Sequence, residues 1–336
     1  MKSAIEKIRQ KKNLTPQEME NAMRAIMKGE AAKEDVASFL LALRDKGPTI
    51  EEITAAARIM RQFALPVKTN HKIILDTCGT GGDKSGTFNI STVVALVVAA
   101  AGVAVAKHGN RSVSSRCGSA DILEALGVKI DLDNVQLGQC LDEVSIAFLF
   151  AQKLHPAMKH AAPVRKELGV ETIFNILGPL TNPAGATHQM VGVYDRKFVE
   201  PLANVLKNLG SKKALVVHGK DGLDEITTTD ETFISEFDGQ KVKSFTVTPE
   251  QFGIKKAKKE DLKGRDLGVN IKITQDTLEG QIGAKRDIVV LNAAHALYIA
   301  EKVRTVADGI KLAQESLDSG KAKKKLEELI KFTNKS

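Results

Sequence analysis

The chain has 336 residues, with 49 lysines and arginines against 41 aspartates and glutamates, a formal net charge of +8, and 43% hydrophobic residues. These values are typical of globular proteins and exclude collagen, coiled-coil and intrinsically disordered classes. At about 150 residues per domain, the length predicts two domains. The three cysteines, Cys78, Cys117 and Cys140, are too few and too scattered for a disulfide framework or a zinc knuckle, so we expect a reducing, cytoplasmic environment.

Residues 1–64 are predicted to form helices only. Thr15 with Glu18, and Thr49 with Glu52, have the spacing of a capping box, and Gly29 is a helix stop signal. The first residues carry charges where a secretory signal needs an apolar core, so secretion is not expected. The hydrophobic period changes near residue 65. We therefore predict an N-terminal α-helical domain over 1–65 and an α/β domain over 66–336.

After residue 65 the pattern alternates between buried strands and helices. A strand at 72–76, a helix at 91–101 and a strand at 103–107 form one βαβ unit, which predicts a parallel sheet. Further strands are predicted at 146–150, 190–194 and 214–218, a hairpin within 226–247, and helices from 287 to 332. The uncharged stretch 87–106 is broken by polar residues and too short for a bilayer span, so it is predicted as a buried helix followed by a strand. The fold class is thus α/β with a mainly parallel central sheet and a small all-α domain.

The positive charge lies mostly at the C-terminal end, where residues 241–336 contain 20 basic and 13 acidic residues. A basic patch is one mark of a nucleic-acid-binding surface. Base stacking, however, needs aromatic residues among the cations, and none is interleaved with the lysine clusters at 255–259 and 321–325. We interpret them as solvated helix faces and expect neither nucleic acid nor membrane as a partner.

A glycine-rich loop, residues 78–83, follows the first predicted strand and precedes a helix. Backbone N–H groups in such a loop can hold a phosphate. The loop is not a Walker A motif, and Lys84 occupies the third glycine position of a dinucleotide fingerprint. By itself this loop is equally well explained as a tight turn.

Two further segments favour a phosphate site. Residues 89–92 supply an amide and hydroxyls at the start of the next helix, and residues 107–115 supply Lys107 and Arg111 after the second strand. Because parallel strands end at the same edge of a sheet, these loops converge on one crevice and together suit a polyphosphate. Asp224 and Glu225 follow a later strand and supply the oxygen ligands that Mg²⁺ prefers, although such a pair is often a surface turn.

Six motifs occur in order along the chain, at residues 79–83, 87–92, 107–115, 118–121, 174–183 and 218–225, with Leu291-Asn292-Ala293-Ala294 near the end. Together they resemble the anthranilate phosphoribosyltransferase family. The resemblance implies transfer of the phosphoribosyl group of 5-phosphoribosyl 1-pyrophosphate (PRPP) to anthranilate in tryptophan biosynthesis. It also implies a homodimer formed through the helical domain, which helices near 155–185 would complete.

The resemblance also implies site residues. Those expected to bind PRPP are Gly79, Gly82, Asp83, Thr87, Asn89, Ile90, Ser91, Thr92, Lys107, His108, Gly109, Asn110, Arg111, Ser112, Val113, Ser114, Ser115 and Ser119. Ser91, Asp224 and Glu225 would hold two Mg²⁺ ions. Asn110 and Arg165 would contact anthranilate, and His108 and His155 would line its path. Two positions depart from the family pattern, Glu171, where arginine is common, and Lys84, where glycine is common.

We expect cleavage at the anomeric carbon to have oxocarbenium character, so that the leaving pyrophosphate needs charge neutralisation more than the amine needs a base. Lys107, Asn110 and Arg165 are the expected catalytic residues. His108 is a candidate base, with a loop histidine of satisfied hydrogen bonds as the alternative. A nucleoside phosphorylase and a nucleic-acid-binding relative without activity are the competing functional hypotheses.

Overall fold

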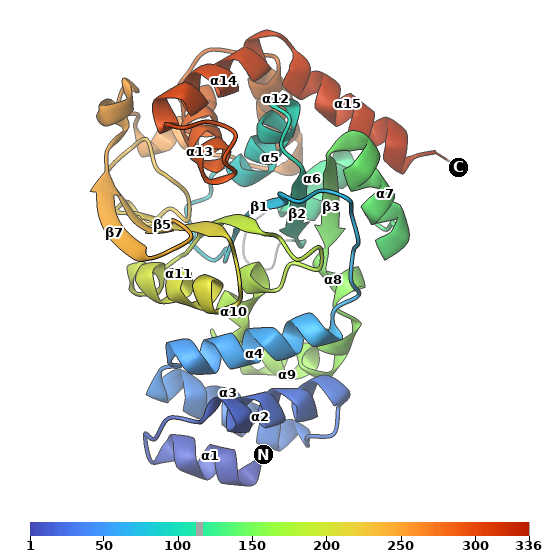
Figure 1. The fold of residues 1–336 in the computed structure, drawn as a ribbon, viewed down its shortest axis with the longest axis vertical. Coiled ribbons are helices and arrows are strands. Elements are labelled where there is room, and N and C mark those ends of the chain that lie inside the picture. Colours follow the sequence, from blue (N-terminus) through green and yellow to red (C-terminus); the bar gives the residue numbers. More distant parts are fainter. Residues whose placement is uncertain (112–116, 336) are drawn as a thin grey trace.

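In the computed structural model, which describes residues 1–111 and 117–335, a small lobe of helices lies beside a larger lobe built on one sheet (Figure 1). The small lobe begins with α1 (Lys2–Arg9), α2 (Pro16–Lys28), α3 (Lys33–Lys46) and α4 (Ile50–Phe63). Both predicted capping boxes are confirmed, at Thr15 and Thr49. Gly29 ends α2 with φ 74°, a left-handed conformation that glycine adopts at little cost.

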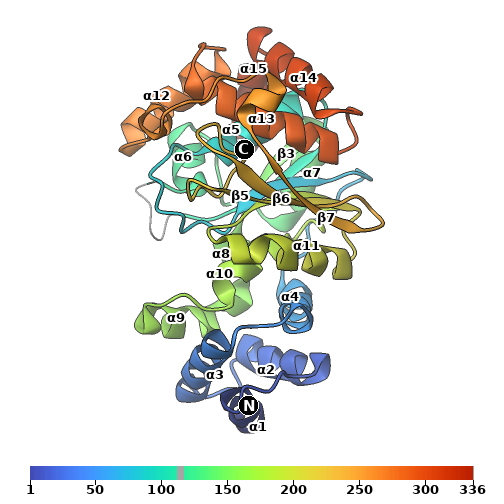
Figure 2. The same cartoon turned by 90° about the vertical axis from the view of Figure 1, so that its left-hand side faces the viewer.

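A segment from the middle of the chain packs on these helices. The 3₁₀-helix η1 (Pro156–His160) lies against α2, and α9 (Ala162–Leu168) lies against α3 (Figure 2). Phe39 of α3 and Val164 of α9 belong to the same buried apolar cluster. The predicted domain boundary at residue 65 stays a prediction, because this cluster continues into the face of the sheet through Val191 and Val216.

The sheet has seven strands in the order β3-β2-β1-β4-β5-β6-β7. They are β1 (Leu75–Gly79), β2 (Val105–Gly109), β3 (Ile146–Phe150), β4 (His188–Gly192), β5 (Lys213–Gly219), β6 (Thr232–Phe237) and β7 (Val242–Val247). The first five are mutually parallel, and β6 and β7 form the predicted antiparallel hairpin. The chain builds outward from β1 through β2 to β3 and then returns to β4 on the other side of β1. The ends of β1 and β4 are therefore a topological switch point, where open α/β sheets bind ligands.

Helices cover both faces of the sheet (Figure 2). One face carries α5 (Ile90–Ala100), α12 (Leu267–Leu278), α13 (Ala284–Ile299), α14 (Val306–Asp318) and α15 (Lys321–Thr333). The other carries α10 (Phe174–Leu177) and α11 (Val199–Asn208), and α11 also contacts α4 of the small lobe. Two short helices, α6 (Ser119–Ala125) and α7 (Asn134–Val144), connect β2 to β3. A third, α8 (Ala151–Leu154), follows β3. Among the described residues, no helix is long and apolar enough to cross a bilayer.

The first two strands lie two to three residues later in the chain than predicted, at 75–79 instead of 72–76 and at 105–109 instead of 103–107. Each prediction ends its strand at a buried polar residue, Asp76 or Lys107, whereas the observed strand continues for two or three residues beyond it. Asp76 and Lys107 are nevertheless accommodated, because each finds hydrogen-bond partners inside the fold. Polarity therefore does not end these strands.

Candidate active site

The candidate site lies where β1, β2, β4 and β5 end. The glycine-rich loop after β1 contains Gly81, Gly82 and Gly86, all with positive φ, and Lys84 with φ 55°. A left-handed lysine is strained, so glycine would adopt this conformation at lower cost. The loop is tied to the end of β4, because Thr80 N–H donates to the Gly192 carbonyl at 2.9 Å and the Thr80 hydroxyl accepts from Tyr194 N–H at 3.1 Å.

Asp224 is fitted closely against two strand ends. A Cβ added to Gly79 would meet Asp224 Oδ2 at 2.5 Å, and one added to Gly192 would overlap the Asp224 carbonyl oxygen. The carboxylate also accepts the Gly81 N–H at 3.1 Å. These glycines are therefore required so that the segment after β5 can approach the glycine-rich loop.

Asp224, Glu225 and Asp83 form a cluster of interacting carboxylates. Burial, followed by the charge of Asp83, raises the pKa of Asp224 to about 7. Burial and the charge of Asp224 hold the pKa of Glu225 well above its ordinary value. Gathering negative charges in this way is costly, and the charge of Lys107 offsets it only in part at Glu225. A divalent cation bound at this point would relieve that repulsion.

The donors fit Mg²⁺ as far as the described residues go. No three His, Cys, Asp or Glu side chains within 1–111 and 117–335 form a ready-made metal cage. Mg²⁺ is commonly held by one or two carboxylates, with water and substrate phosphates completing its six ligands. Asp224, Glu225 and the Ser91 hydroxyl are hard oxygen donors of this kind.

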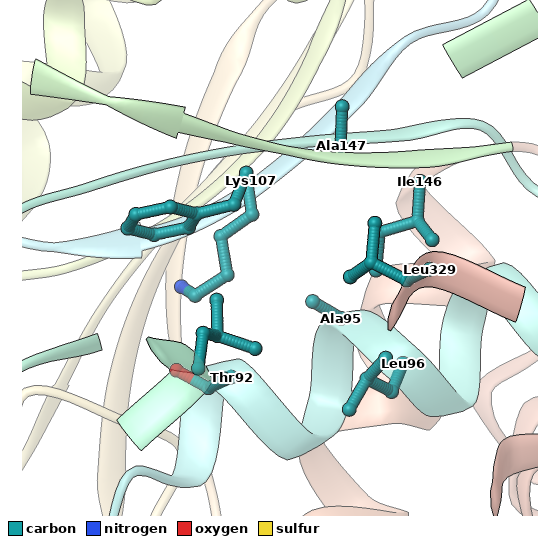
Figure 3. A pocket seen from close by; sticks show the side chains of 9 residues that line it. Thr92, Ala95, Leu96, Lys107, Ile146, Ala147 and Leu329 are labelled. Carbon is teal, nitrogen blue, oxygen red and sulfur yellow. The ribbon is translucent and has the colours of Figure 1, made fainter. Parts of the chain in front are cut away.

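Lys107 is the buried cation of the site, with 3% of its surface exposed. Its Nζ donates to the Thr77 carbonyl at 2.5 Å and to Ser91 Oγ at 3.1 Å, at the start of α5. Figure 3 shows the Lys107 chain running over a cavity of about 10 Å³ toward Thr92. This cavity is about the size of one water molecule. This cavity is therefore too small for an organic ligand, and the open strand ends are the expected place for one.

The N-terminus of α5 carries polar groups that have no partner among residues 1–111 and 117–335. Asn89 Nδ2 donates to the Cys117 carbonyl at 3.0 Å, which fixes the side chain. In the described chain, Asn89 Oδ1 and Thr92 Oγ1 are buried without a hydrogen bond. Buried polar groups are rarely left unpaired, and a helix N-terminus attracts anions. Ile90 lies in the same first turn, so residues 89–92 are brought together here as predicted from the sequence.

His108 and His155 form a buried pair whose Nε2 atoms are 3.2 Å apart. His108 Nδ1 lies 3.2 Å from the Gly178 carbonyl, which can only accept, so the proton is on Nδ1. His108 Nε2 then accepts from His155. Burial lowers the pKa of His108 to about 3 and that of His155 to about 4. Both nitrogens of His108 are thus occupied, which favours the satisfied loop histidine over a general base.

Asn110 and Arg165 are left available for a second substrate. Asn110 Oδ1 accepts from Arg111 N–H at 2.8 Å and from Gln152 Nε2 at 3.1 Å, which leaves its Nδ2 group as a donor. Arg165 stacks over the Phe174 ring at 5.2 Å, and burial lowers the pKa of its guanidinium. It has no ion-pair partner in the described part of the chain. A partly buried guanidinium without a carboxylate is suited to bind one from a ligand.

The remaining predicted residues lie around the same edge. Gly109 ends β2, Thr87 follows the glycine-rich loop, and Ser119 Oγ donates to the Asn110 carbonyl at 3.3 Å. Ser112, Val113, Ser114 and Ser115 lie outside the described residues.

Sequence reasoning missed the buried carboxylate beneath the site. Asp76 is fully buried and accepts from His108 N–H at 3.0 Å and from Asn182 Nδ2 at 2.8 Å. Asn182 also donates to the Ala106 carbonyl at 2.8 Å. This network fastens the end of β2 to the segment that contains Gly178. The only available signal was the presence of Asn182 in the motif at 174–183.

Comparison with known proteins identifies relatives along the whole chain. The family models described as "Glycosyl transferase family, a/b domain" and "Glycosyl transferase family, helical bundle domain" match residues 71–323 and 2–64. An anthranilate phosphoribosyltransferase of Symbiobacterium thermophilum is 52% identical over 335 residues, which is 100% of this chain and 98% of that protein.

Solved structures agree. The anthranilate phosphoribosyltransferase of Thermus thermophilus superposes with a TM-score of 0.94 at 44% identity, covering 99% of both chains. That of Saccharomyces cerevisiae in complex with PRPP and Mg gives 0.88 at 27% identity, covering 95% of this chain and 93% of that one. The yeast enzyme with 4-fluoroanthranilate gives 0.86 at 26% identity, with the same coverage.

Proposed function

This chain belongs to the anthranilate phosphoribosyltransferases, and we propose how its own residues perform their reaction. The enzyme transfers the phosphoribosyl group of PRPP to anthranilate, giving N-(5-phosphoribosyl)anthranilate and pyrophosphate in tryptophan biosynthesis. In the reaction the bond from the anomeric carbon to the pyrophosphate oxygen breaks, and its electron pair leaves with pyrophosphate. The amine lone pair forms the new bond to that carbon, and the nitrogen releases one proton.

The diphosphate of PRPP binds between the glycine-rich loop, the N-terminus of α5 and the loop after β2. Lys107 neutralises charge that develops on the leaving pyrophosphate, because its ammonium group is buried and already oriented by Thr77 and Ser91. Ser91, Asp224 and Glu225 would hold two Mg²⁺ ions, and the yeast relative was solved in complex with PRPP and Mg. Bound Mg²⁺ supplies further positive charge to the phosphate oxygens.

Anthranilate is oriented by Asn110 and Arg165. The observation that carries this assignment is the partly buried Arg165 guanidinium, which has no carboxylate partner among the described residues. A bidentate pair with the anthranilate carboxylate would aim the amine at the anomeric carbon. No side chain is assigned as a base, since His108 is already fully hydrogen-bonded.

Substitution of Arg165 tests this arrangement. We expect Arg165→Ala to raise KM for anthranilate about 10- to 100-fold with a smaller effect on KM for PRPP, because one charge-assisted pair is lost. Turnover is followed by the loss of anthranilate fluorescence with PRPP and Mg²⁺. Arg58→Ala, which removes an exposed arginine bonded to the Asn208 carbonyl, is the matched control. Unchanged anthranilate saturation in Arg165→Ala would refute the assignment. In a separate test of the unmodified chain with uridine and phosphate, release of the base would support the competing phosphorylase hypothesis.

The assembly and location are further proposals. The chain forms a homodimer through α1–α4 with residues 155–185, acts in the cytoplasm, and divides into domains at residues 1–65 and 66–336. The three cysteines are buried thiols, which suits a reducing compartment. Light scattering on the purified chain distinguishes monomer from dimer.

A further inference from the structure

Arg111 directs its guanidinium group at helix α6. Nη1 donates to Asp121 Oδ1 at 3.0 Å and to Glu124 Oε2 at 2.7 Å, while Nη2 donates to Glu124 Oε1 at 3.1 Å. A guanidinium has five N–H groups. Three are therefore used by the two carboxylates, and the other two have no partner among residues 1–111 and 117–335.

The two unused N–H groups lie on one edge of the guanidinium. Nη1 is the nitrogen on the same side as Cδ, and both of its hydrogens are taken. The groups that remain are Nε–H and the Nη2 hydrogen on the same side as Nε–H, and these two point in the same direction. This pair is the fork that binds two oxygens of a phosphate.

Several contacts hold this edge in position. The Arg111 guanidinium carbon lies 5.7 Å from the centre of the Phe150 ring, at the end of β3. Its backbone N–H donates to Asn110 Oδ1 at 2.8 Å. Asp121 also caps α6 through Gly118 N–H at 2.8 Å, so it cannot be replaced without disturbing the helix. Glu124 lies one turn further on and is 53% exposed at its side chain, so it is free of such a structural role.

We propose that Glu124, together with Asp121, is a positioning residue that holds Arg111 with its Nε–Nη2 edge open to a phosphate group of PRPP. This inference rests on the proposed function, in which Arg111 binds PRPP. Two carboxylates also lower the local positive charge, which by itself would weaken phosphate binding. These ion pairs are exposed and screened by solvent, so they lower the positive charge only slightly. The orientation that they give Arg111 therefore outweighs the loss of charge.

The test measures KM for PRPP in Glu124→Gln. This variant keeps one oxygen acceptor but loses the charge and the bidentate pair. We expect KM for PRPP to rise about three- to tenfold, with kcat and KM for anthranilate unchanged. Glu315→Gln on α14, which removes an equally exposed ion pair with Lys321, is the control and keeps wild-type kinetics. Thermal unfolding of both variants checks that the fold is unaffected.

A double-mutant cycle with Arg111→Ala assigns the effect to Arg111. If Glu124 acts through Arg111, Glu124→Gln changes nothing further in the Arg111→Ala background. An equal rise in that background, or a lower KM in the single variant, refutes the inference while leaving the role of Arg111 intact. If Arg111→Ala itself leaves KM for PRPP unchanged, the Arg111 assignment in the proposed function fails as well. Inhibition by pyrophosphate and by ribose 5-phosphate then shows which phosphate is bound, because only one of the two constants weakens.

Discussion

Asp224 is positioned by its surroundings more than by any opposite charge. It has no ion-pair partner in the described chain, and it contacts Gly79 and the Gly81 N–H instead. Burial, followed by the negative charge of Asp83, raises the pKa of its carboxyl group. A carboxylate held in this way, without a lysine or arginine as its ion-pair partner in the described chain, is suited to bind a metal cation.

Asp224→Asn is therefore expected to raise the Mg²⁺ concentration needed for half-maximal activity. Loss of one formal charge from a set of oxygen ligands weakens a hard-cation site, by about tenfold or more here. The measurement is initial rate against Mg²⁺ concentration at saturating PRPP. Asp276→Asn, which breaks an exposed pair with Lys272, serves as control. The same Mg²⁺ dependence in both variants would show that Asp224 is not a ligand.

At the residue scale, the sequence predicted which side chains gather but not how they are held. Lys107, Asn89 and Asp224 were expected at one edge because parallel strands end together. The contacts of Asp76 with Asn182, and of Arg111 with Glu124, join positions that no local period connects. Such pairs depend on tertiary packing, so they appear only in the structure.

Among the secondary-structure elements, the long buried runs were predicted best, since β3 and α5 lie within one residue of their predicted bounds. β3 was placed at its observed bounds, because 146–150 is a continuous buried run. α12 was not predicted, since Leu267–Leu278 contains Gly268 and several β-branched residues with low helix propensity. Packing against α5 and α6 stabilises it instead.

The end of β4 offers a test of close packing between elements. Gly192→Ala places a Cβ on the Asp224 carbonyl oxygen, a backbone atom that cannot rotate away. We expect a loss of about 1–3 kcal/mol in stability from overpacking, and a larger loss of kcat because Asp224 is displaced. Gly268→Ala in α12, which meets only the tip of Asp266 at 3.4 Å, is the control and keeps its activity. Equal behaviour of the two variants in thermal unfolding and turnover would contradict this account.

Helix α13 contains a buried histidine that should make stability depend on pH. His295 Nδ1 donates to the Leu291 carbonyl at 2.9 Å, and burial lowers the pKa of His295 to about 4. The unfolded state, with the ordinary value near 6.5, binds the proton first, so stability is full above about pH 6.5 and falls as the pH drops toward 4.

The expected slope from this group is about 1.4 kcal/mol per pH unit between those values. His295→Gln removes it, so the free energy of unfolding should fall less steeply with acid than in the wild type. Urea unfolding at a series of pH values measures the slope, and His71→Gln, a partly buried histidine on the loop before β1, controls for loss of a histidine. A slope unchanged in His295→Gln would assign the acid sensitivity elsewhere.

Across the whole molecule, two buried clusters meet at the sheet. One fills the space between the sheet and α5, α13, α14 and α15. The other runs without a break from Phe39 and Ile53 in the small lobe to Val191 and Val216 on the opposite face of the sheet. The small lobe is thus joined to the catalytic lobe by apolar packing, and we expect the two to unfold together.

Phe39→Ala tests this coupling. Phe39 is fully buried in α3, so its loss should lower the free energy of unfolding by about 3–5 kcal/mol, whereas Phe245→Ala on β7, 41% exposed, should change it by about 0.5 kcal/mol or less. The chain has no tryptophan, and both tyrosines, Tyr194 and Tyr298, lie in the catalytic lobe. Tyrosine fluorescence therefore reports that lobe, while far-ultraviolet circular dichroism reports all helices. Coincident shifts of both signals in Phe39→Ala are expected because the cluster is shared, and a shift in circular dichroism alone would mean that the lobes unfold independently.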